Sequence, residues 1–141
     1  SGTARALLAL AAQGYDPALL TAASGQSALD YLRTQAITYT HDASGTTPAH
    51  LFPANAGLLL TAVSAAGGTP ASFGGMNLTA ELTATYHADT GAYSTTAVLG
   101  WTSGAASVLN QSWAILGLSA AGHAVPLTAT AYLAAMQSAD G

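Results

Sequence analysis

A block of apolar and small residues that ends in glycine occurs three times along the chain. The clearest copies are NAGLLLTAVSAAG at 55–67 and NQSWAILGLSAAG at 110–122, which keep one register through the final Ser-Ala-Ala-Gly. A weaker copy, TARALLALAAQG, lies at 3–14. Alanine and leucine favour helix, and glycine readily adopts the left-handed conformation that closes one. The pattern therefore predicts three helices, each ending near its glycine. These glycines are Gly14, Gly67 and Gly122.

A second, more polar helix is predicted after each of these. A proline follows each glycine closely and cannot continue the same helix. Beyond it, ALDYLRTQ at 28–35 and TAYLAAMQ at 130–137 share a Tyr-Leu pair and carry their polar residues on one side, as an outer helix with one solvated face does. The middle counterpart, 78–86, is richer in threonine. The glycine-ended helices of the second and third copies are apolar or small on every side, so we expect them to be buried on more than one face.

The two kinds of helix together predict an all-α chain of three hairpins, roughly 3–36, 54–86 and 107–137, within a single domain 1–141. The Gly-rich loops inside the hairpins are longer than minimal turns, and such loops are where binding residues often lie. The segment 36–41 has some β propensity but is too short and isolated to predict a strand.

Composition narrows the possible partners. Half of the residues are apolar and only 6% are charged; there is no lysine, and Arg5 and Arg33 are the only arginines. This chain has no basic surface for a phosphate backbone or an anionic membrane, so nucleic-acid binding is not expected. Thr, Ser and Gly interrupt every apolar run, so no membrane span is predicted. The absence of cysteine excludes disulfides, thiolate catalysis and thiolate metal sites.

The two ends of the sequence suggest a segment of something larger. There is no initiating methionine or signal peptide, and the chain stops at Asp140-Gly141 inside a recurring motif. We therefore expect it to be excised from a longer protein. Low charge with abundant Thr, Ser, Ala and Gly is associated with an extracellular or cell-surface setting, which is the predicted localisation.

The hairpins and the turns DTGAY at 89–93 and ADG at 139–141 resemble the prenyltransferase and squalene-cyclase repeat. The likeness is greatest to bacterial, secreted-looking members related to the helical domain of intrinsic factor and transcobalamin. Its most specific parts are 89–141 and then GGTPASFGG at 67–75, and it covers nearly the whole chain. It implies an α/α toroid, a ring of inner helices inside a ring of outer helices with about six hairpins, of which this chain would supply about half.

The enzymes that share this fold need residues that this chain lacks. The resemblance implies a zinc set of Asp, Cys and His for prenyl transfer, an acidic cluster for cyclisation, and a Cys near a Gln for thioester chemistry. Cysteine is absent, and Asp30 and Glu81 each stand alone on a predicted outer helix. No catalytic, cofactor-binding or metal-binding residue is therefore predicted.

Several polar residues have a catalytic and a structural interpretation. The histidines and acids at His41-Asp42, His50, His87 and Asp89 lack the i, i+4 spacing of a helical metal site, so we interpret the histidines as solvated loop residues and expect no tightly bound zinc.

Four further residues are interpreted as structural rather than functional. Asp16 before Pro17, and Asp89 before Thr90-Gly91, are interpreted as a cap and a turn. Asn77 and Asn110 match the glycosylation pattern but are interpreted as helix caps.

Aromatic residues supply the only candidate ligand contacts, and these are Trp113, Trp101, Phe73 and Tyr93. In a ring they could stack on a hydrophobic or planar ligand. The competing interpretation places Trp113 in the core, where Leu58 lies in the previous copy.

The leading hypothesis is a non-catalytic binding or scaffold domain of an extracellular or cell-surface bacterial protein. Two alternatives stay open: half of a terpenoid cyclase or prenyltransferase whose catalytic residues lie outside this segment, and a small-ligand, corrin-like carrier domain. The expected partners are the remaining hairpins of a parent toroid, a small hydrophobic ligand, and a second copy of the chain. Self-association is expected because half a ring leaves its end flanks bare. Those flanks are predicted to be lined by Leu7, Leu10, Ile115, Leu118 and Leu133.

Overall fold

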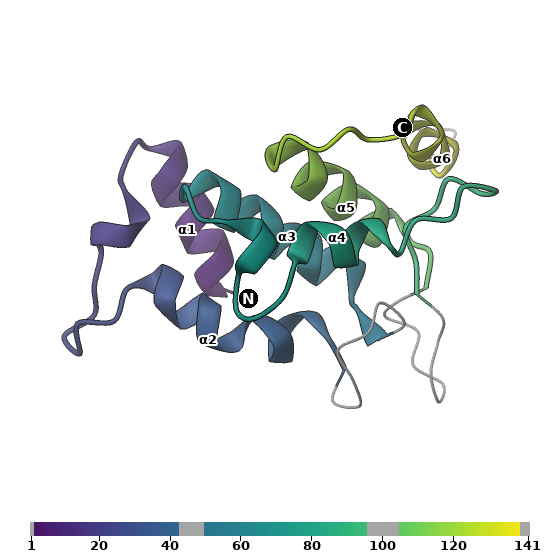
Figure 1. Ribbon diagram of the computed structural model, residues 1–141. Coiled ribbons are helices and arrows are strands. Elements are labelled where there is room, and N and C mark those ends of the chain that lie inside the picture. The colour runs from purple at the N-terminus through teal and green to yellow at the C-terminus, as the bar shows by residue number, and fades with distance from the viewer. Residues whose placement is uncertain (1, 43–49, 96–104, 139–141) are drawn as a thin grey trace.

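The computed structural model describes residues 2–42, 50–95 and 105–138, and the regular structure within these ranges is helical (Figure 1). Pairing between extended residues in these ranges is limited to isolated bridges, so the all-α prediction is confirmed. None of the described helices is long and apolar enough to cross a membrane. The α-helices are α1 (Gly2–Ala12), α2 (Ala28–Thr40), α3 (Pro53–Ala65), α4 (Leu78–Thr83), α5 (Val108–Ala120) and α6 (Leu127–Ala135), and the short 3₁₀ helices are η1 (Pro17–Leu19) and η3 (Pro70–Ser72).

The helices α1, α3 and α5 all close in the same way. In α3 the N–H of Gly67 donates to the carbonyl of Ser64 (3.1 Å), and the next N–H, that of Gly68, donates to Val63 (2.8 Å). The same pair of bonds closes α1 and α5, and the glycines have φ of 78°, 67° and 72°. Glycine adopts this conformation without the cost that a Cβ would impose. The predicted helix ends at Gly14, Gly67 and Gly122 are confirmed.

Side-chain caps mark where the polar helices begin. The hydroxyl of Ser27 accepts from the N–H of Asp30 (3.0 Å), and the amide oxygen of Asn77 accepts from Ala80 (3.0 Å). The capping role predicted for Asn77 is confirmed. The one predicted for Asn110 is wrong, because Ser107 caps α5 and Asn110 lies one turn inside the helix, buried.

The helices pack as hairpin 1 (α1 and α2), hairpin 2 (α3 and α4) and hairpin 3 (α5 and α6). The glycine-ended helices contact one another in order, α1 against α3 and α3 against α5. Around them, α2 contacts α1 and α3, α4 contacts α3 and α5, and α6 contacts α5 (Figure 1). Helix α2 runs to Thr40, so the segment with some β propensity is helical almost to its end.

The core is centred on α3, where eight of 13 residues are buried, against two of 11 in α1 and five of 13 in α5. The prediction of burial on several faces is confirmed for this helix. For α5 the same prediction is wrong, because its buried residues lie on one face of the helix and Leu116 is exposed. The contact with α5 is made backbone to backbone. A Cβ on Gly57 would lie 2.1 Å from the carbonyl oxygen of Trp113, and one on Gly117 would lie 2.6 Å from that of Gly57. Only glycine permits so close an approach.

The predicted lining of the end flanks needs correction. Leu7 and Leu118 are each 1% exposed, because both face the core around α3. Leu10, Ile115 and Leu133 are partly buried. The apolar side chains that do face solvent belong to neighbouring positions, among them Leu19, Leu20, Val108, Leu109 and Leu116.

Candidate functional site

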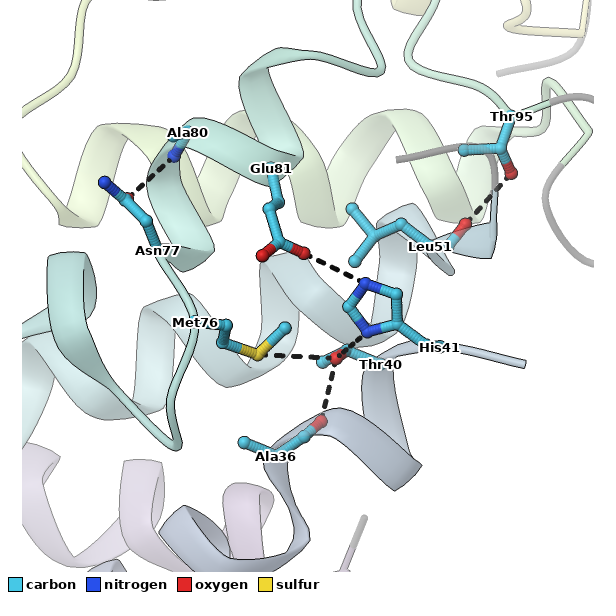
Figure 2. A network of polar contacts seen from close by, with 9 residues as sticks. All are labelled: Ala36, Thr40, His41, Leu51, Met76, Asn77, Ala80, Glu81 and Thr95. Carbon is cyan, nitrogen blue, oxygen red and sulfur yellow. Dashed lines mark hydrogen bonds and ion pairs between the residues drawn. The ribbon is translucent and has the colours of Figure 1, made fainter. Parts of the chain in front are cut away.

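A buried polar network joins the end of α2 to α4 (Figure 2). Thr40 is the last residue of α2, and His41 is its C-cap, with its N–H donating to the carbonyl of Ile37 (2.9 Å). The His41 side chain is 0% exposed, and its Nε2 lies 2.9 Å from Oε2 of Glu81. Its Nδ1 lies 2.9 Å from the Thr40 hydroxyl, which also donates to the carbonyl of Ala36 (2.8 Å).

This network corrects two expectations. His41 is not a solvated loop histidine, and Glu81 does not stand alone on its helix. The reason is that α2 continues to Thr40 and a bridge then pairs His41 with Leu51, which directs the imidazole inward toward α4. The His41–Glu81 contact is not a well-aligned hydrogen bond, and within the described residues neither atom has another hydrogen-bond partner. Nε2 of His41 and Oε2 of Glu81 therefore face each other as polar neighbours.

The remaining candidate histidines lie apart from this network. Nδ1 of His50 is 3.0 Å from Oδ2 of Asp42, at side chains about a fifth exposed. His87 is exposed, and its Nε2 lies 3.1 Å from the carbonyl of Ser94. Asp89 lies in the exposed turn that follows. Over ranges 2–42, 50–95 and 105–138, no three His, Asp or Glu residues are placed to hold one metal ion.

The charged pair on α2 is also structural. Oδ1 of Asp30 lies 2.7 Å from Nη1 of Arg33, one turn along the exposed face. The Ser27 hydroxyl donates to Asp30 (2.7 Å), and this bond, together with the nearby guanidinium, lowers the pKa of the Asp30 carboxyl. Asp30 therefore belongs to the cap of α2 and does not stand alone.

The aromatic candidates do not converge on a ligand site in the described structure. Phe73 and Tyr93 are each 1% exposed, so their rings are core residues that anchor loops. The Arg33 guanidinium lies over the Phe73 ring (5.4 Å), and the ring of Tyr93 lies 5.2 Å from that of Tyr86. Trp113 is partly buried and packs against the core. Trp101 lies outside the described residues.

Gln111 is a buried polar residue whose role the sequence interpretation missed. Its Oε1 accepts from the N–H of Tyr93 (2.8 Å), and its Nε2 donates to the carbonyls of Gly91 (2.9 Å) and Ala129 (2.8 Å). One side chain thereby ties the turn after α4 to α5 and α6. The sequence feature that indicates a buried polar role is the Asn110-Gln111 pair in an otherwise largely apolar helix.

The turn predicted at Asp89-Thr90-Gly91 and the cap predicted at Asp16 are both present. The N–H of Gly91 donates to the carbonyl of His87 (2.7 Å) at a φ of 81°, which confirms the turn predicted at Asp89-Thr90-Gly91. Oδ1 of Asp16 accepts from the N–H of Ala18 (2.9 Å), which confirms Asp16 as the cap of η1.

An open cavity of about 580 Å³, here called the α4 groove, lies along the outer side of α4. Its lining consists of methyl, hydroxyl and amide groups with a single imidazole, and it contains no carboxylate or arginine. Ligand sites for small molecules commonly have volumes of this order and this mixture of apolar wall and few polar groups. The lining residues are Ala71, Asn77, Thr79, Ala80, Thr83, Ala84 and His123.

Comparison with known proteins adds no relative: no protein-family model, no curated protein and no solved structure matches the chain. The resemblance to the prenyltransferase and squalene-cyclase repeat therefore stays a prediction from the sequence.

Proposed function

We propose that the chain is a non-catalytic binding or scaffold domain of an extracellular or cell-surface bacterial protein. The observation that carries this proposal is that buried polar side chains link neighbouring hairpins. His41 and Glu81 tie hairpin 1 to hairpin 2, and Gln111 ties hairpin 2 to hairpin 3. His41 and Glu81, which could otherwise perform acid–base chemistry, are thus engaged in holding hairpins 1 and 2 together. The proposed localisation is supported by composition alone.

The proposal extends to the architecture. Helices α1, α3 and α5 contact in order, the alternate helices pack around them, and all three close with the same glycine motif. These features support about half of an α/α toroid, with the remaining hairpins of a parent ring as its natural partners.

The α4 groove is the proposed binding surface within this domain. Its three alanines offer an apolar wall, while Asn77, Thr79 and Thr83 offer hydrogen bonds without charge. Such a surface favours a neutral, partly apolar ligand, because an ionic ligand would find no carboxylate or guanidinium partner there.

Calorimetric titration with farnesol, a neutral apolar probe, tests the proposal. We expect farnesol to bind, and Ala80→Trp, which fills the groove, to weaken that binding at least tenfold. Ala9→Trp, on the exposed face of α1, is the matched control and should leave binding unchanged. No farnesol binding, or equal binding by the Ala80→Trp variant, would contradict the groove. Conversion of farnesyl diphosphate to any product would contradict a non-catalytic domain and favour the enzyme alternative.

A further inference from the structure

Two asparagines of the chain lie in the acceptor pattern for N-linked sugars, in which the second residue after the asparagine is serine or threonine. They are Asn77, in Asn-Leu-Thr, and Asn110, in Asn-Gln-Ser. In N-glycosylation the side-chain nitrogen Nδ2 becomes bonded to the sugar. The exposure and the hydrogen bonds of that one atom therefore decide whether each asparagine of the folded chain is an acceptor.

The Nδ2 atom of Asn77 is accessible and is not used by the helix cap. Asn77 is exposed, and its Oδ1 accepts from the N–H of Ala80 (3.0 Å), which is the bond that caps α4. Its Nδ2 makes no hydrogen bond within the part of the chain that the structure describes, and it points away from α4 in Figure 2. Capping and glycosylation would therefore use different atoms of the same side chain.

The surroundings of Asn77 leave room for a sugar and for the enzyme that transfers it. Asn77 and Thr79 both line the α4 groove, an open cavity of about 580 Å³. The carbonyl of Thr79 accepts from the Thr83 hydroxyl (2.8 Å), but the hydroxyl of Thr79 itself donates to no residue in the described ranges. The hydroxyl that completes the acceptor pattern is therefore as free as the amide nitrogen.

The second pattern is closed by the fold. Asn110 is 4% exposed, its Oδ1 accepts from the N–H of Ala54 (3.0 Å), and its Nδ2 donates to the carbonyl of Ala105 (2.7 Å). A sugar on this nitrogen would break the bond to Ala105 and separate the start of α5 from the start of α3. The folded chain thus presents the two patterns in opposite states, one open and one buried.

We propose that Asn77 is an acceptor for an N-linked sugar on the folded chain and that Asn110 is not. The co-substrate class is a nucleoside-diphosphate hexose. A bond forms between Nδ2 and the anomeric carbon, and the bond from that carbon to the diphosphate oxygen breaks. The diphosphate leaves with the electron pair of the broken bond, and Nδ2 loses one proton. The proposal rests on the extracellular setting proposed above only for its occurrence in the cell, because sugars on this pattern belong to protein surfaces.

Incubation of the folded chain with UDP-glucose and a soluble N-glycosyltransferase that recognises Asn-x-Ser/Thr, followed by mass spectrometry of proteolytic fragments, tests the proposal. We expect the mass of one hexose to be gained by the fragment that contains Asn77. Asn77→Asp keeps a capping side chain without the amide nitrogen, and Thr79→Val keeps Asn77 without the hydroxyl. Each should gain hexose at least tenfold less than the original sequence. Ser112→Ala removes the second pattern, and as the matched control it should gain hexose like the original sequence.

Circular dichroism verifies that each variant is folded. A folded chain that gains no hexose, or that gains it at Asn110, would overturn the proposal, and so would undiminished transfer to the Thr79→Val variant. The assay uses the purified chain and involves neither its localisation nor farnesol binding. The acceptor site and the proposed function can therefore fail independently of each other.

Discussion

Helices α3 and α5 are copies of one sequence pattern, yet they occupy different environments. Eight of the 13 residues of α3 are buried, against five of 13 in α5. Leu60 of α3 is 0% exposed, whereas its counterpart Ile115 is partly exposed, and Leu116 is 52% exposed at the position where α3 has Thr61. The difference follows from position, because α3 has a glycine-ended helix on each side and α5 has one only.

The array, rather than the individual copy, therefore determines which residues are buried. A repeat that cannot bury its apolar surface alone derives its stability from its neighbours. Hairpins 1 and 3, at the ends of the array, carry large apolar side chains that no neighbouring hairpin covers. An exposed apolar surface of this kind commonly marks an interface.

The largest effect is expected from Gly57→Leu at the crossing of α3 and α5. A Cβ there meets the backbone of Trp113 at 2.1 Å, and backbone cannot move aside as a flexible side chain can. The two helices must separate, so we expect a loss of at least about 4 kcal/mol in the free energy of unfolding, or no cooperative fold. Gly2→Ala, where a Cβ meets no atom within 4 Å, is the control and should change little. Urea denaturation measures both, and a stable Gly57→Leu variant would refute the close crossing.

A pair of leucine truncations compares the two copies directly. Leu59 of α3 is 0% exposed, so Leu59→Ala should lower the free energy of unfolding by about 2–5 kcal/mol through lost burial and a residual cavity. Leu116 of α5 is 52% exposed, so Leu116→Ala should cost no more than about 0.5 kcal/mol in the monomer. Equal costs in thermal or urea unfolding would show that the two helices are buried alike.

A smaller effect is expected at the joint between hairpins 1 and 2. Glu81→Ala leaves the buried Nε2 of His41 without its polar neighbour, which should lower stability by about 1–3 kcal/mol. In the His41→Leu background the same change should cost less, because the imidazole is no longer present, and the double-mutant cycle measures that coupling. Asp89→Ala, at an exposed acidic residue, is the matched control. If the costs of Glu81→Ala and His41→Leu in unfolding free energy simply add, the two side chains do not interact, which would contradict the contact between hairpins 1 and 2.

The buried phenol of Tyr93 should make stability depend on pH in the alkaline range. Burial, with a contribution from nearby Tyr86, raises the pKa of Tyr93 to about 12 from its ordinary value of 10.0. The folded state therefore holds this proton more tightly than the unfolded state, and the resulting stabilisation is complete below about pH 10 and is lost as the pH rises toward 12. Phenylalanine cannot ionise, so over this pH range we expect the free energy of unfolding of the Tyr93→Phe variant to fall by roughly 2 kcal/mol less than that of the unmodified chain. Unfolding curves of the two proteins that fall in parallel between these pH values would contradict it.

Local signals in the sequence were sufficient for the ends of the helices. Gly67 and Gly122, the caps at Asp16 and Asn77, and the turn at Gly91 depend on conformations and bonds that span only a few residues. Asn110 was misassigned because Ser107 and Asn110 are both good caps before the same apolar run, and the residues alone do not decide between them.

Contacts between distant segments could not be predicted in the same way. The His41–Glu81 contact joins residues 40 positions apart, and it requires α2 to end and turn at one particular residue. In the sequence, the close crossing of α3 and α5 is indicated only by a glycine inside a predicted helix. Glycine at such a position costs about 1 kcal/mol of stability relative to alanine, so its presence indicates a packing reason. Neither residue type nor spacing identified Gly117 as the position opposite Gly57.

Hydrogen exchange, followed at individual amides in dilute monomer, tests the central claim most directly. The claim is that hairpin 2 is the covered centre of the array and that its neighbours are open at their outer flanks. We predict that the amides of α3 exchange most slowly, through opening of the whole fold, and that those of α6 exchange at least about tenfold faster through local opening. Equal protection of α3 and α6, or faster exchange in α3, would contradict the account.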